Sequence, residues 1–255
     1  MRYHPGTAIE KARFLLELDP LRSWFFYSLW YKDDRAPKGG VAGTYYEFGV
    51  GWGNSMRRYF LALQDFCRYK GRDLSQFHAF GFDSFQGLPP KAAPQDDHWS
   101  WTVGGMSTDQ ATVLNKVFRG TGLQPRVHLE LVPGYFEKSL TPELRDRLAK
   151  TPPSIVTIDV DYYSSTKTVL EWLRPILPSG TLFYFDDIWS FHGHPKKGEI
   201  AAIREFNAQE KGWLVPFPKL STTSMLDRTF IYAREEFEFG SDRNASPPPR
   251  ATPGA

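Results

Sequence analysis

Glu47-Phe48-Gly49-Val50-Gly51-Trp52-Gly53 is the stretch that decides how this sequence is expected to fold. It stands where an apolar strand expected over residues 43–48 gives way to a helix expected over 55–69. Glycines at such a junction let the backbone turn sharply and approach a ligand without a Cβ in the way. A dinucleotide-binding turn, Gly-x-Gly-x-x-Gly, would need its third glycine where this chain has Asn54. The spacing therefore disfavours an NAD(P)-binding oxidoreductase, which stays open as an alternative.

Strand and helix patterns alternate along the rest of the chain. Apolar, β-branched and aromatic residues predict parallel strands over 77–82, 127–132, 154–158 and 181–185, and closing antiparallel strands over 213–217 and 229–233. The capping-box pattern Ser107-Thr108-Asp109-Gln110 predicts a helix through Phe118, and a further helix is expected over 199–209. This alternation predicts an α/β fold, with a Rossmann-like, mostly parallel seven-stranded sheet and helices on both faces.

An acidic residue follows the second strand. Asp83 ends that strand in Phe82-Asp83-Ser84, where its carboxylate can accept hydrogen bonds from both ribose hydroxyls of a nucleoside. The carboxyl ends of parallel strands form the ligand crevice of an open sheet, so the glycine loop and Asp83 are expected to meet. The predicted nucleotide-binding residues are Glu47, Gly49, Gly51, Gly53, Asn54, Asp83 and Ser84. The alternative is a connecting glycine turn beside an aspartate that caps a turn.

Two pairs of aspartates form a second candidate site. Asp159-Val160-Asp161 follows the fourth strand, and Asp186-Asp187 follows the fifth. Consecutive parallel strands usually lie near each other, so these carboxylates are expected to converge. Such a cluster destabilises a fold unless a cation lies within it, and Mg²⁺ is a hard divalent ion that favours oxygen ligands. The alternative is that Asp161 and Asp187 cap the helices that follow them.

The acidic residue two positions before three alternate glycines is similar to the first motif of class I methyltransferases, which bind S-adenosylmethionine. Methyl transfer from a sulfonium is an in-line displacement by an oxygen nucleophile that must be positioned and deprotonated. A metal would position the oxygen and lower its pKa, and a spare carboxylate would accept the proton. Asp159 and Asp161 are the predicted catalytic residues.

Further motifs resemble one family in particular, the macrocin O-methyltransferases of antibiotic tailoring. The matching stretches are Glu47-Phe48-Gly49-Val50-Gly51, Gly81-Phe82-Asp83-Ser84-Phe85-Gln86-Gly87-Leu88-Pro89, Val132-Pro133-Gly134-Tyr135-Phe136, Asp159-Val160-Asp161-Tyr162-Tyr163-Ser164-Ser165-Thr166, and Pro178-Ser179-Gly180 leading to Asp186-Asp187. The resemblance implies an enzyme that depends on S-adenosylmethionine and Mg²⁺ and methylates hydroxyls of sugars on natural products. It implies metal-ligand roles for Asp159, Asp186 and Asp187, a place beside the metal or substrate for Asp161, and cofactor contacts for Glu47 and Asp83.

Two departures from the family pattern concern the acceptor. Ser164 stands where the family tends to carry an acidic residue, and the segment after Asp187 contains His192 and His194. Each histidine is a candidate to touch the acceptor, to act as a base or to replace a metal ligand. The alternative for each is an ordinary loop histidine.

The composition limits the partners of the chain. Its 31 Lys and Arg residues nearly balance 29 Asp and Glu residues, so the net charge of +2 gives no reason to expect a nucleic-acid or membrane partner. The predicted partner is a small-molecule hydroxyl acceptor. A methyltransferase of nucleic acid or protein and a non-catalytic Rossmann-like binding protein stay open as alternatives. The single Cys67 and the lack of a signal-peptide pattern predict a cytoplasmic location.

Three regions are expected along the chain. Residues 1–40 would form an N-terminal helical lid or extension, 41–237 the S-adenosylmethionine-dependent methyltransferase domain, and 238–255 a disordered Pro-rich tail. The aromatic segment Trp24–Tyr31 is too short to span a bilayer, and its open uses are a lid over an apolar acceptor, a homodimer contact and core packing. The turn-rich run 84–106 is expected to lack a regular element and to be functional.

Overall fold

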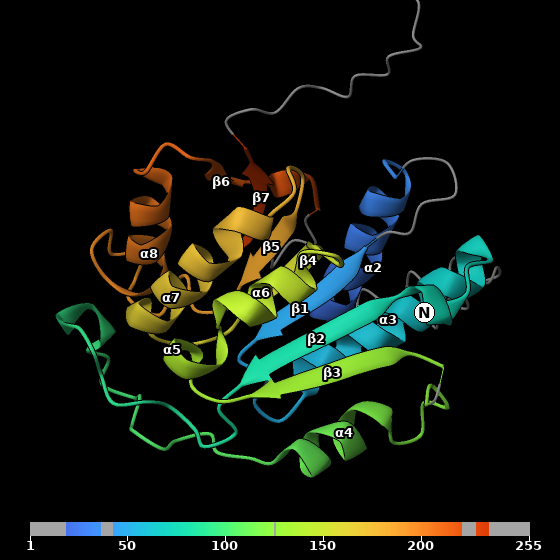
Figure 1. Cartoon of the computed structure of the whole chain (residues 1–255), viewed down its shortest axis with the longest axis horizontal. Coiled ribbons are helices and arrows are strands. Elements are labelled where there is room, and N and C mark those ends of the chain that lie inside the picture. Colours follow the sequence, from blue (N-terminus) through green and yellow to red (C-terminus); the bar gives the residue numbers. More distant parts are fainter. Residues whose placement is uncertain (1–18, 37–42, 125, 221–227, 235–255) are drawn as a thin grey trace, which may run out of the picture.

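The computed structural model describes residues 19–36, 43–124, 126–220 and 228–234, and they contain one seven-stranded sheet. The strands are β1 (Thr44–Phe48), β2 (His78–Asp83), β3 (His128–Pro133), β4 (Pro153–Ile158), β5 (Leu182–Phe185), β6 (Trp213–Pro216) and β7 (Thr229–Ala233). Their order across the sheet is β3-β2-β1-β4-β5-β7-β6 (Figure 1). The first five strands run parallel, and β7 lies antiparallel to both β5 and β6. The predicted mostly parallel α/β sheet is confirmed.

Helices cover both faces of this sheet (Figure 1). They are α2 (Pro20–Asp33), α3 (Asn54–Lys70), α4 (Gln110–Phe118), α5 (Phe136–Ser139), α6 (Pro142–Leu148), α7 (Tyr163–Leu173) and α8 (Gly198–Asn207). Short 3-10 turns occur at Leu74–Gln76, Pro94–Asp96, Arg174–Ile176 and Pro218–Leu220. Buried residues of α2, α3 and α4 form one core with one face of the sheet, and those of α6, α7 and α8 form a second core with the other face.

Alternation along each strand divides its side chains between the two cores. In β1, Tyr45 packs with α2 and α3, whereas Tyr46 and Phe48 pack with α7 and α8. Every residue of β1 and β4 is buried. Strands that are buried on both faces have nearly continuous apolar sequences. These two strands could therefore be predicted although polar residues do not alternate along them.

The observed bounds lie close to the predicted ones, with two corrections. Asp109 caps α4, and its side chain accepts hydrogen bonds from the backbone N–H (2.8 Å) and the hydroxyl (2.6 Å) of Thr112. The capping box predicted from Ser107 is therefore wrong, because the cap falls two residues later. The second correction is the pair α5 and α6, which the sequence prediction omitted. Thr141 caps α6 and Pro142 is its first residue, so a start signal was present in the sequence.

The aromatic segment near the N-terminus forms a core helix. Trp24, Phe25 and Leu29 of α2 are fully buried, and α2 packs along α3. No residue of α2 lines the cavity described below, so core packing is the use that the structure shows for it. Residues 1–18 and 235–255, which hold the rest of the predicted N-terminal region and the tail, lie outside the described residues. No helix in the described part of the chain is long and apolar enough to cross a membrane.

Candidate active site

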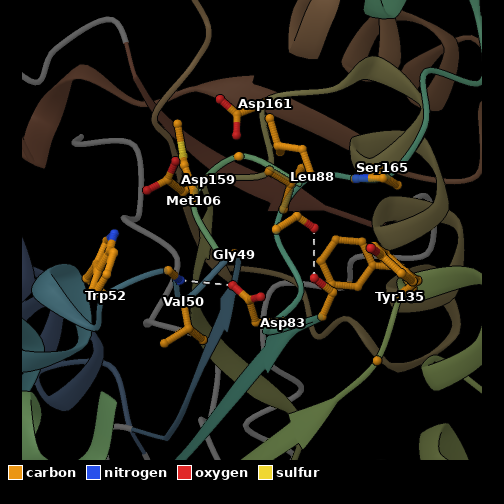
Figure 2. A pocket seen from close by; sticks show the side chains of 18 of the residues that line it. Gly49, Val50, Trp52, Asp83, Leu88, Met106, Tyr135, Asp159, Asp161 and Ser165 are labelled. Carbon is orange, nitrogen blue, oxygen red and sulfur yellow. Dashed lines mark hydrogen bonds between the residues drawn. The ribbon is translucent and has the colours of Figure 1, made fainter. Parts of the chain in front are cut away.

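A cavity opens at the carboxyl ends of β1, β2, β3 and β4 (Figure 2). The sheet order reverses here, because β2 and β3 lie on one side of β1 while β4 and β5 lie on the other. Ligands of open α/β sheets bind at such switch points. The cavity encloses about 910 Å³ of empty space, including its mouth. Its walls come from the glycine loop, from Asp83 with parts of the run 84–106, from residues 134–137 after β3, and from residues 159–161 after β4.

The glycine loop forms one wall of the cavity. The N–H of Gly49 donates to the carbonyl of Phe82 (2.9 Å), which fixes the loop beside β2. Gly49 has a φ of +81°, and a Cβ at this position would lie 1.7 Å from the carbonyl oxygen of Asp159. Gly51 has a φ of +49°, and a Cβ there would meet no heavy atom within 4 Å. Gly49 therefore allows two chain segments to pass closely, whereas Gly51 faces the open cavity.

Asp83 is held in one orientation at the end of β2. Its carboxylate accepts hydrogen bonds from the N–H of Gly51 (2.9 Å; Figure 2) and the N–H of Phe85 (2.7 Å). Each carboxylate oxygen can accept a further hydrogen bond, so acceptor capacity is left for a ligand. The neighbouring Ser84 also lines the cavity, but its hydroxyl donates to the carbonyl of Gly87 (2.9 Å). The proton of the Ser84 hydroxyl is thus already used, whereas Asp83 offers a charged carboxylate that can accept ligand hydroxyls on both oxygens.

Glu47 lies behind the cavity wall. Its fully buried carboxylate accepts hydrogen bonds from the hydroxyls of Tyr45 (2.7 Å) and Ser55. Burial raises the pKa of Glu47 to about 7, against the opposing effect of these two donors. Gly53 also lies outside the cavity wall, at the start of α3. Both residues therefore fix the glycine loop to α3 and do not line the cavity themselves.

The four aspartates follow β4 and β5 beside the glycine loop, where Asp159 and Asp161 line the cavity and Asp186 and Asp187 do not. The N–H of Asp161 donates to the carboxylate of Asp187 (3.2 Å), which links the ends of β4 and β5. Burial raises the pKa of Asp159 well above its usual range, and the charges of Asp186 and Asp187 add to the rise. Burial, followed by the same two charges, also raises the pKa of Asp161 to about 7. The structure therefore brings both predicted aspartate pairs together.

Two of these aspartates already have protein partners. Asp186 accepts hydrogen bonds from the guanidinium of Arg228 (3.0 Å) and the hydroxyl of Tyr184 (2.9 Å), and Asp187 accepts one from the hydroxyl of Ser190 (2.9 Å). Over the ranges that the structure describes, no three acidic, cysteine or histidine side chains stand together as a ready set of metal ligands. The donor chemistry still fits a hard divalent cation, because the carboxylates exceed the positive charge that Arg228 supplies.

Asp161 is the central residue of a tight turn. Its φ is +60°, and the N–H of Tyr162 donates to the carbonyl of Val160 (2.6 Å), a pattern that defines a γ-turn. A residue other than glycine costs free energy in this conformation, and such residues cluster at functional sites. The turn places Asp161 in the cavity wall immediately before α7.

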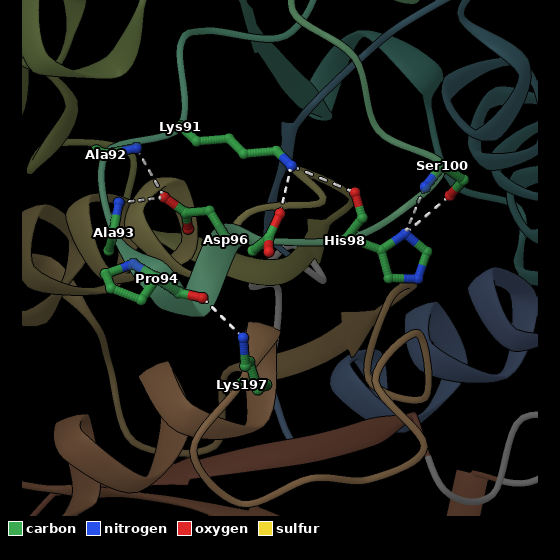
Figure 3. Close-up of polar contacts among 9 residues, drawn as sticks. Lys91, Ala92, Ala93, Pro94, Asp96, His98, Ser100 and Lys197 are labelled. Atoms are coloured by element: carbon green, nitrogen blue, oxygen red, sulfur yellow. Dashed lines mark hydrogen bonds and ion pairs between the residues drawn. The ribbon is translucent and has the colours of Figure 1, made fainter.

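Asp96 is a buried residue of the run 84–106 that sequence reasoning missed. Its carboxylate accepts hydrogen bonds from the N–H groups of Ala92 and Ala93 (Figure 3) and from that of Ser164, each at 2.9 Å. Ser164 lies in the first turn of α7, so Asp96 supplies this helix with a capping carboxylate from a distant loop.

Neither of the helices that follow the aspartate pairs is capped by those aspartates. The cap position of α7 is Tyr162 and that of α8 is Lys197, and neither side chain makes a capping hydrogen bond. The alternative that Asp161 and Asp187 serve as caps is therefore wrong, because Asp161 faces the cavity and Asp187 accepts from Asp161 and Ser190.

The run 84–106 is fixed to the loop that follows Asp187. Nε2 of His98 donates to the carbonyl of Ser190 (3.0 Å), and the ammonium of Lys197 donates to the carbonyl of Pro94 (2.8 Å) (Figure 3). The rings of Trp101 and Phe191 pack edge to face, with 5.5 Å between their centres. These contacts hold two loops together over the carboxyl edge of the sheet.

His192 and His194 do not line the cavity. Nδ1 of His194 accepts a hydrogen bond from the N–H of Lys196 (3.1 Å), and His192 has a φ of +54°. Sequence reasoning also left out several residues that do line it, among them Leu88, Met106, Tyr135 and Phe136. Leu88 belongs to the family-like stretch 81–89, and Tyr135 and Phe136 belong to the one at 132–136, so these stretches were the available signals for them.

Glu199, in the first turn of α8, is a further acid that no sequence motif marked. It is 1% exposed, and neither of its carboxylate oxygens has a hydrogen-bond partner. Burial raises the pKa of Glu199 well above its usual range, and the charges of Asp187, Asp159 and Asp186 add to the rise. The acidic group therefore extends beyond the four predicted aspartates.

A switch-point cavity with a glycine loop and an acidic residue after β2 is the arrangement expected of a class I methyltransferase. Residues 34–214 match the model of the macrocin-O-methyltransferase (TylF) family, and the chain belongs to that family. The protein is therefore an S-adenosylmethionine-dependent O-methyltransferase. The resemblance inferred from the sequence is confirmed.

Two solved structures share this fold. The calicheamicin methyltransferase CalS11 is 22% identical and superimposes with a TM-score of 0.58, over 91% of this chain and 81% of that one. The O-methyltransferase NovP is 19% identical with a TM-score of 0.57, over 84% of this chain and 79% of its own. At this level of identity the likeness shows the fold alone. No curated protein sequence matches the chain.

Proposed function

We propose that this enzyme transfers the methyl group of S-adenosylmethionine to a hydroxyl of a sugar-bearing small molecule, with assistance from Mg²⁺. The observation that carries the proposal is the pairing of two unlike walls in one cavity. The wall of the glycine loop and Asp83 suits a nucleoside. The wall of Asp159 and Asp161 suits a cation and a proton transfer.

The first wall would hold the nucleoside half of S-adenosylmethionine. Asp83 offers acceptor capacity to the ribose hydroxyls, since its two backbone donors occupy only part of the carboxylate. The proposed cofactor contacts on the wall are Gly49, Gly51, Asn54, Asp83 and Ser84, and the residues that fix this wall from behind are Glu47 and Gly53. Negative charge on the adjoining wall of Asp159 and Asp161 favours the positively charged sulfonium.

Asp159, Asp186 and Asp187 are the proposed ligands of Mg²⁺. Carboxylate oxygens are common protein ligands of this ion, and its charge would offset the repulsion among the three groups. When bound, the ion supplies charge stabilisation for the acceptor oxygen and lowers its pKa.

Asp161 is the proposed proton acceptor, with Asp159 as the alternative. The γ-turn places the carboxylate of Asp161 in the cavity wall, and the contact of its N–H with Asp187 holds the turn. The hydroxyl proton of the acceptor passes to this carboxylate as the acceptor oxygen attacks the methyl carbon. The new C–O bond replaces the C–S bond, and S-adenosylhomocysteine leaves.

A sugar hydroxyl is the proposed methylation site. CalS11 is a TDP-rhamnose 3'-O-methyltransferase. We propose that this enzyme also methylates a sugar hydroxyl, on an acceptor without the nucleotide. An apolar part of the cavity wall is formed by Leu88, Met106 and Tyr135, and it suits the non-sugar part of such a molecule. His192 and His194 lie outside the wall and are proposed as contacts to the far end of a large acceptor.

Methyl transfer from radiolabelled S-adenosylmethionine to a panel of natural-product glycosides tests this proposal. We expect label in a hydroxyl of at least one glycoside, loss of transfer in EDTA and recovery on addition of Mg²⁺. Full activity in the chelator would contradict the metal role. Calorimetry should show binding of S-adenosylhomocysteine and none of NADH, and the reverse result would favour the NAD(P)-binding alternative.

A further inference from the structure

Trp52 is a large apolar side chain at the mouth of the cavity to which the chemistry described above gives no role. It lines the cavity, and it is 54% exposed. In Figure 2 its indole stands apart from the other labelled side chains. A tryptophan that is half exposed beside a cavity leaves apolar surface in water until a ligand covers it. Trp52 is therefore a candidate contact for a ligand of this cavity.

The other exposed large aromatic side chains of the described residues have partners within the protein. Three of them meet a neighbouring ring, with centres 5.7, 4.9 and 5.7 Å apart, and the pairs are Tyr27 with Phe26, Tyr69 with Trp30, and Trp99 with His98. Trp189 lies against Gly193, where a Cβ would come 2.6 Å from its ring. As far as the described ranges extend, the indole of Trp52 has neither a ring partner nor a hydrogen bond. Ring packing within the protein therefore does not account for Trp52.

A tight turn fixes the backbone of Trp52. The N–H of Gly53 donates to the carbonyl of Val50 (2.8 Å), which closes a β-turn that has Trp52 as its third residue. On one side, the N–H of Gly51 donates to the carboxylate of Asp83 (2.9 Å). On the other side, a Cβ on Gly53 would lie 3.1 Å from a side chain of α4. The turn is held from both sides, so a ligand that contacts the indole does not have to order the loop first.

The proposed reaction requires a large acceptor to pass through this mouth. Only one sugar hydroxyl has to reach the methyl group, so the rest of the acceptor extends toward solvent. Met106, from the run 84–106, also lines the cavity and is 59% exposed. Two loops therefore place exposed apolar side chains where the non-sugar part of the acceptor would lie.

We propose that Trp52 is a specificity-determining residue whose indole stacks on an aromatic ring in the non-sugar part of the acceptor. This inference rests on the sugar-bearing acceptor of the proposed function. Stacked aromatic pairs add binding free energy beyond the burial of their area, and the thioether of Met106 suits the same ring. The enzyme thus selects its acceptor by the non-sugar part as well as by the sugar.

Calorimetric titration with methyl and naphthyl glycosides of L-rhamnose and D-glucose tests this inference. The full-length chain is first saturated with S-adenosylhomocysteine and Mg²⁺. For the sugar that binds, we expect the wild type to bind the naphthyl glycoside about tenfold more tightly than the methyl glycoside. Trp52→Ala should lose most of this preference, and Trp52→Phe should keep most of it. Equal affinities of the wild type for the two glycosides would overturn the inference.

Trp99→Ala is the matched control. Trp99 is 92% exposed and does not line the cavity, so its replacement should leave the preference for the naphthyl glycoside unchanged. A loss of preference as large as that of Trp52→Ala would overturn the assignment to Trp52.

Two further measurements separate this role from a structural one and from a cofactor contact. The Tm of Trp52→Ala should stay close to that of the wild type, because the side chain is half exposed and has no ring partner. Failure of this variant to fold would overturn the inference. The affinity for S-adenosylhomocysteine alone should also stay the same, and a tenfold loss would assign Trp52 to the cofactor.

The outcomes distinguish this inference from the proposed function. A wild type that binds no naphthyl glycoside would overturn the inference, whereas methyl transfer to the glycoside panel would still support the proposed function. Absence of both would contradict the proposed function and this inference with it.

Discussion

The carboxylates on the two sides of the cavity differ in their hydrogen-bond donors and charged neighbours. On the side of the glycine loop, Asp83 accepts two backbone hydrogen bonds, and Glu47 accepts two from hydroxyls. On the side of β4 and β5, burial and neighbouring acids raise the pKa of Asp159 and Asp161. The hydrogen bonds of the first wall are thus supplied by the protein, whereas the second wall holds more carboxylates than the guanidinium of Arg228 can balance. The difference indicates that the nucleoside wall is preformed and that the acidic wall depends on a ligand to balance its charge.

Asp161→Asn should have the largest effect and should act on the acidic wall alone. Loss of the proposed proton acceptor is expected to lower the rate of methyl transfer by about 10²- to 10⁴-fold. The affinity for S-adenosylhomocysteine should stay the same, because the glycine loop and Asp83 are untouched. Initial rates with an accepted glycoside and calorimetric titration measure the two quantities. A variant with full activity would remove Asp161 from the mechanism.

Gly49→Ala and Gly51→Ala compare two glycines of the preformed wall. A Cβ on Gly49 would lie 1.7 Å from the carbonyl of Asp159 at a φ of +81°, so we expect a loss of about 3 kcal/mol in the free energy of unfolding. Gly51 has open space around it, so Gly51→Ala should lose only about 1 kcal/mol in the free energy of unfolding, because alanine is unfavourable at a φ of +49°. Chemical denaturation measures both. Equal losses would mean that the loop does not pass as closely to β4 as the structure shows.

Glu47→Gln tests the buried acid behind that wall through its pH dependence. Because burial raises the pKa of Glu47 from 4.5 to about 7, its contribution to stability is present below the lower value and is lost as pH rises through the higher one. The free energy of unfolding of the wild type should therefore fall relative to the variant over this window, by a difference on the order of 3 kcal/mol. Denaturation of both proteins, free of cofactor, at several pH values checks this. Parallel pH profiles would show that Glu47 is not perturbed.

Asp83→Asn tests whether the preformed wall binds the nucleoside. An amide keeps one acceptor oxygen but loses the negative charge, so the affinity for S-adenosylhomocysteine should fall by about 10- to 100-fold. The affinity for Mn²⁺ should not change, because the aspartates after β4 and β5 are intact. Titration calorimetry measures both ligands. Unchanged affinity for the nucleoside would place its ribose elsewhere.

Asp96→Asn should have the smallest effect on ligand binding, because Asp96 does not line the cavity, and it tests the loop that joins the two walls. An amide cannot accept from Ser164 on one oxygen and from Ala92 and Ala93 on the other, so we expect a loss of about 2 kcal/mol in the free energy of unfolding. Hydrogen exchange should increase at the N-terminus of α7. Asp97→Asn is the matched control, because Asp97 is 75% exposed and pairs only with Lys91 among the described residues. Similar behaviour of the two variants would argue against the capping role.

The features that could be predicted from the sequence are those with local signals. The fourth strand is an apolar run, and Asp159 and Asp161 come directly after it. Since the carboxyl ends of parallel strands meet at one edge, the positions of the strand ends were sufficient to expect the aspartates and the glycine loop in one place. The structure has both in the walls of the same cavity.

The features that could not be predicted depend on tertiary packing. Asp96 meets Ser164 across a separation of 68 residues. No local pattern encodes this contact. Glu47 is different, because its position on the same strand face as Tyr45 turns it toward α3, and strand alternation alone could have indicated this.

A crystal structure of the enzyme with S-adenosylhomocysteine and Mn²⁺, with the metal located by its anomalous scattering, tests the division of the cavity most directly. We expect the ribose hydroxyls on the carboxylate of Asp83 and one anomalous peak bordered by Asp159, Asp186 and Asp187. A ribose placed away from Asp83, or no peak at these aspartates in saturating Mn²⁺, would contradict the assignment of one wall to the nucleoside and the other to a cation.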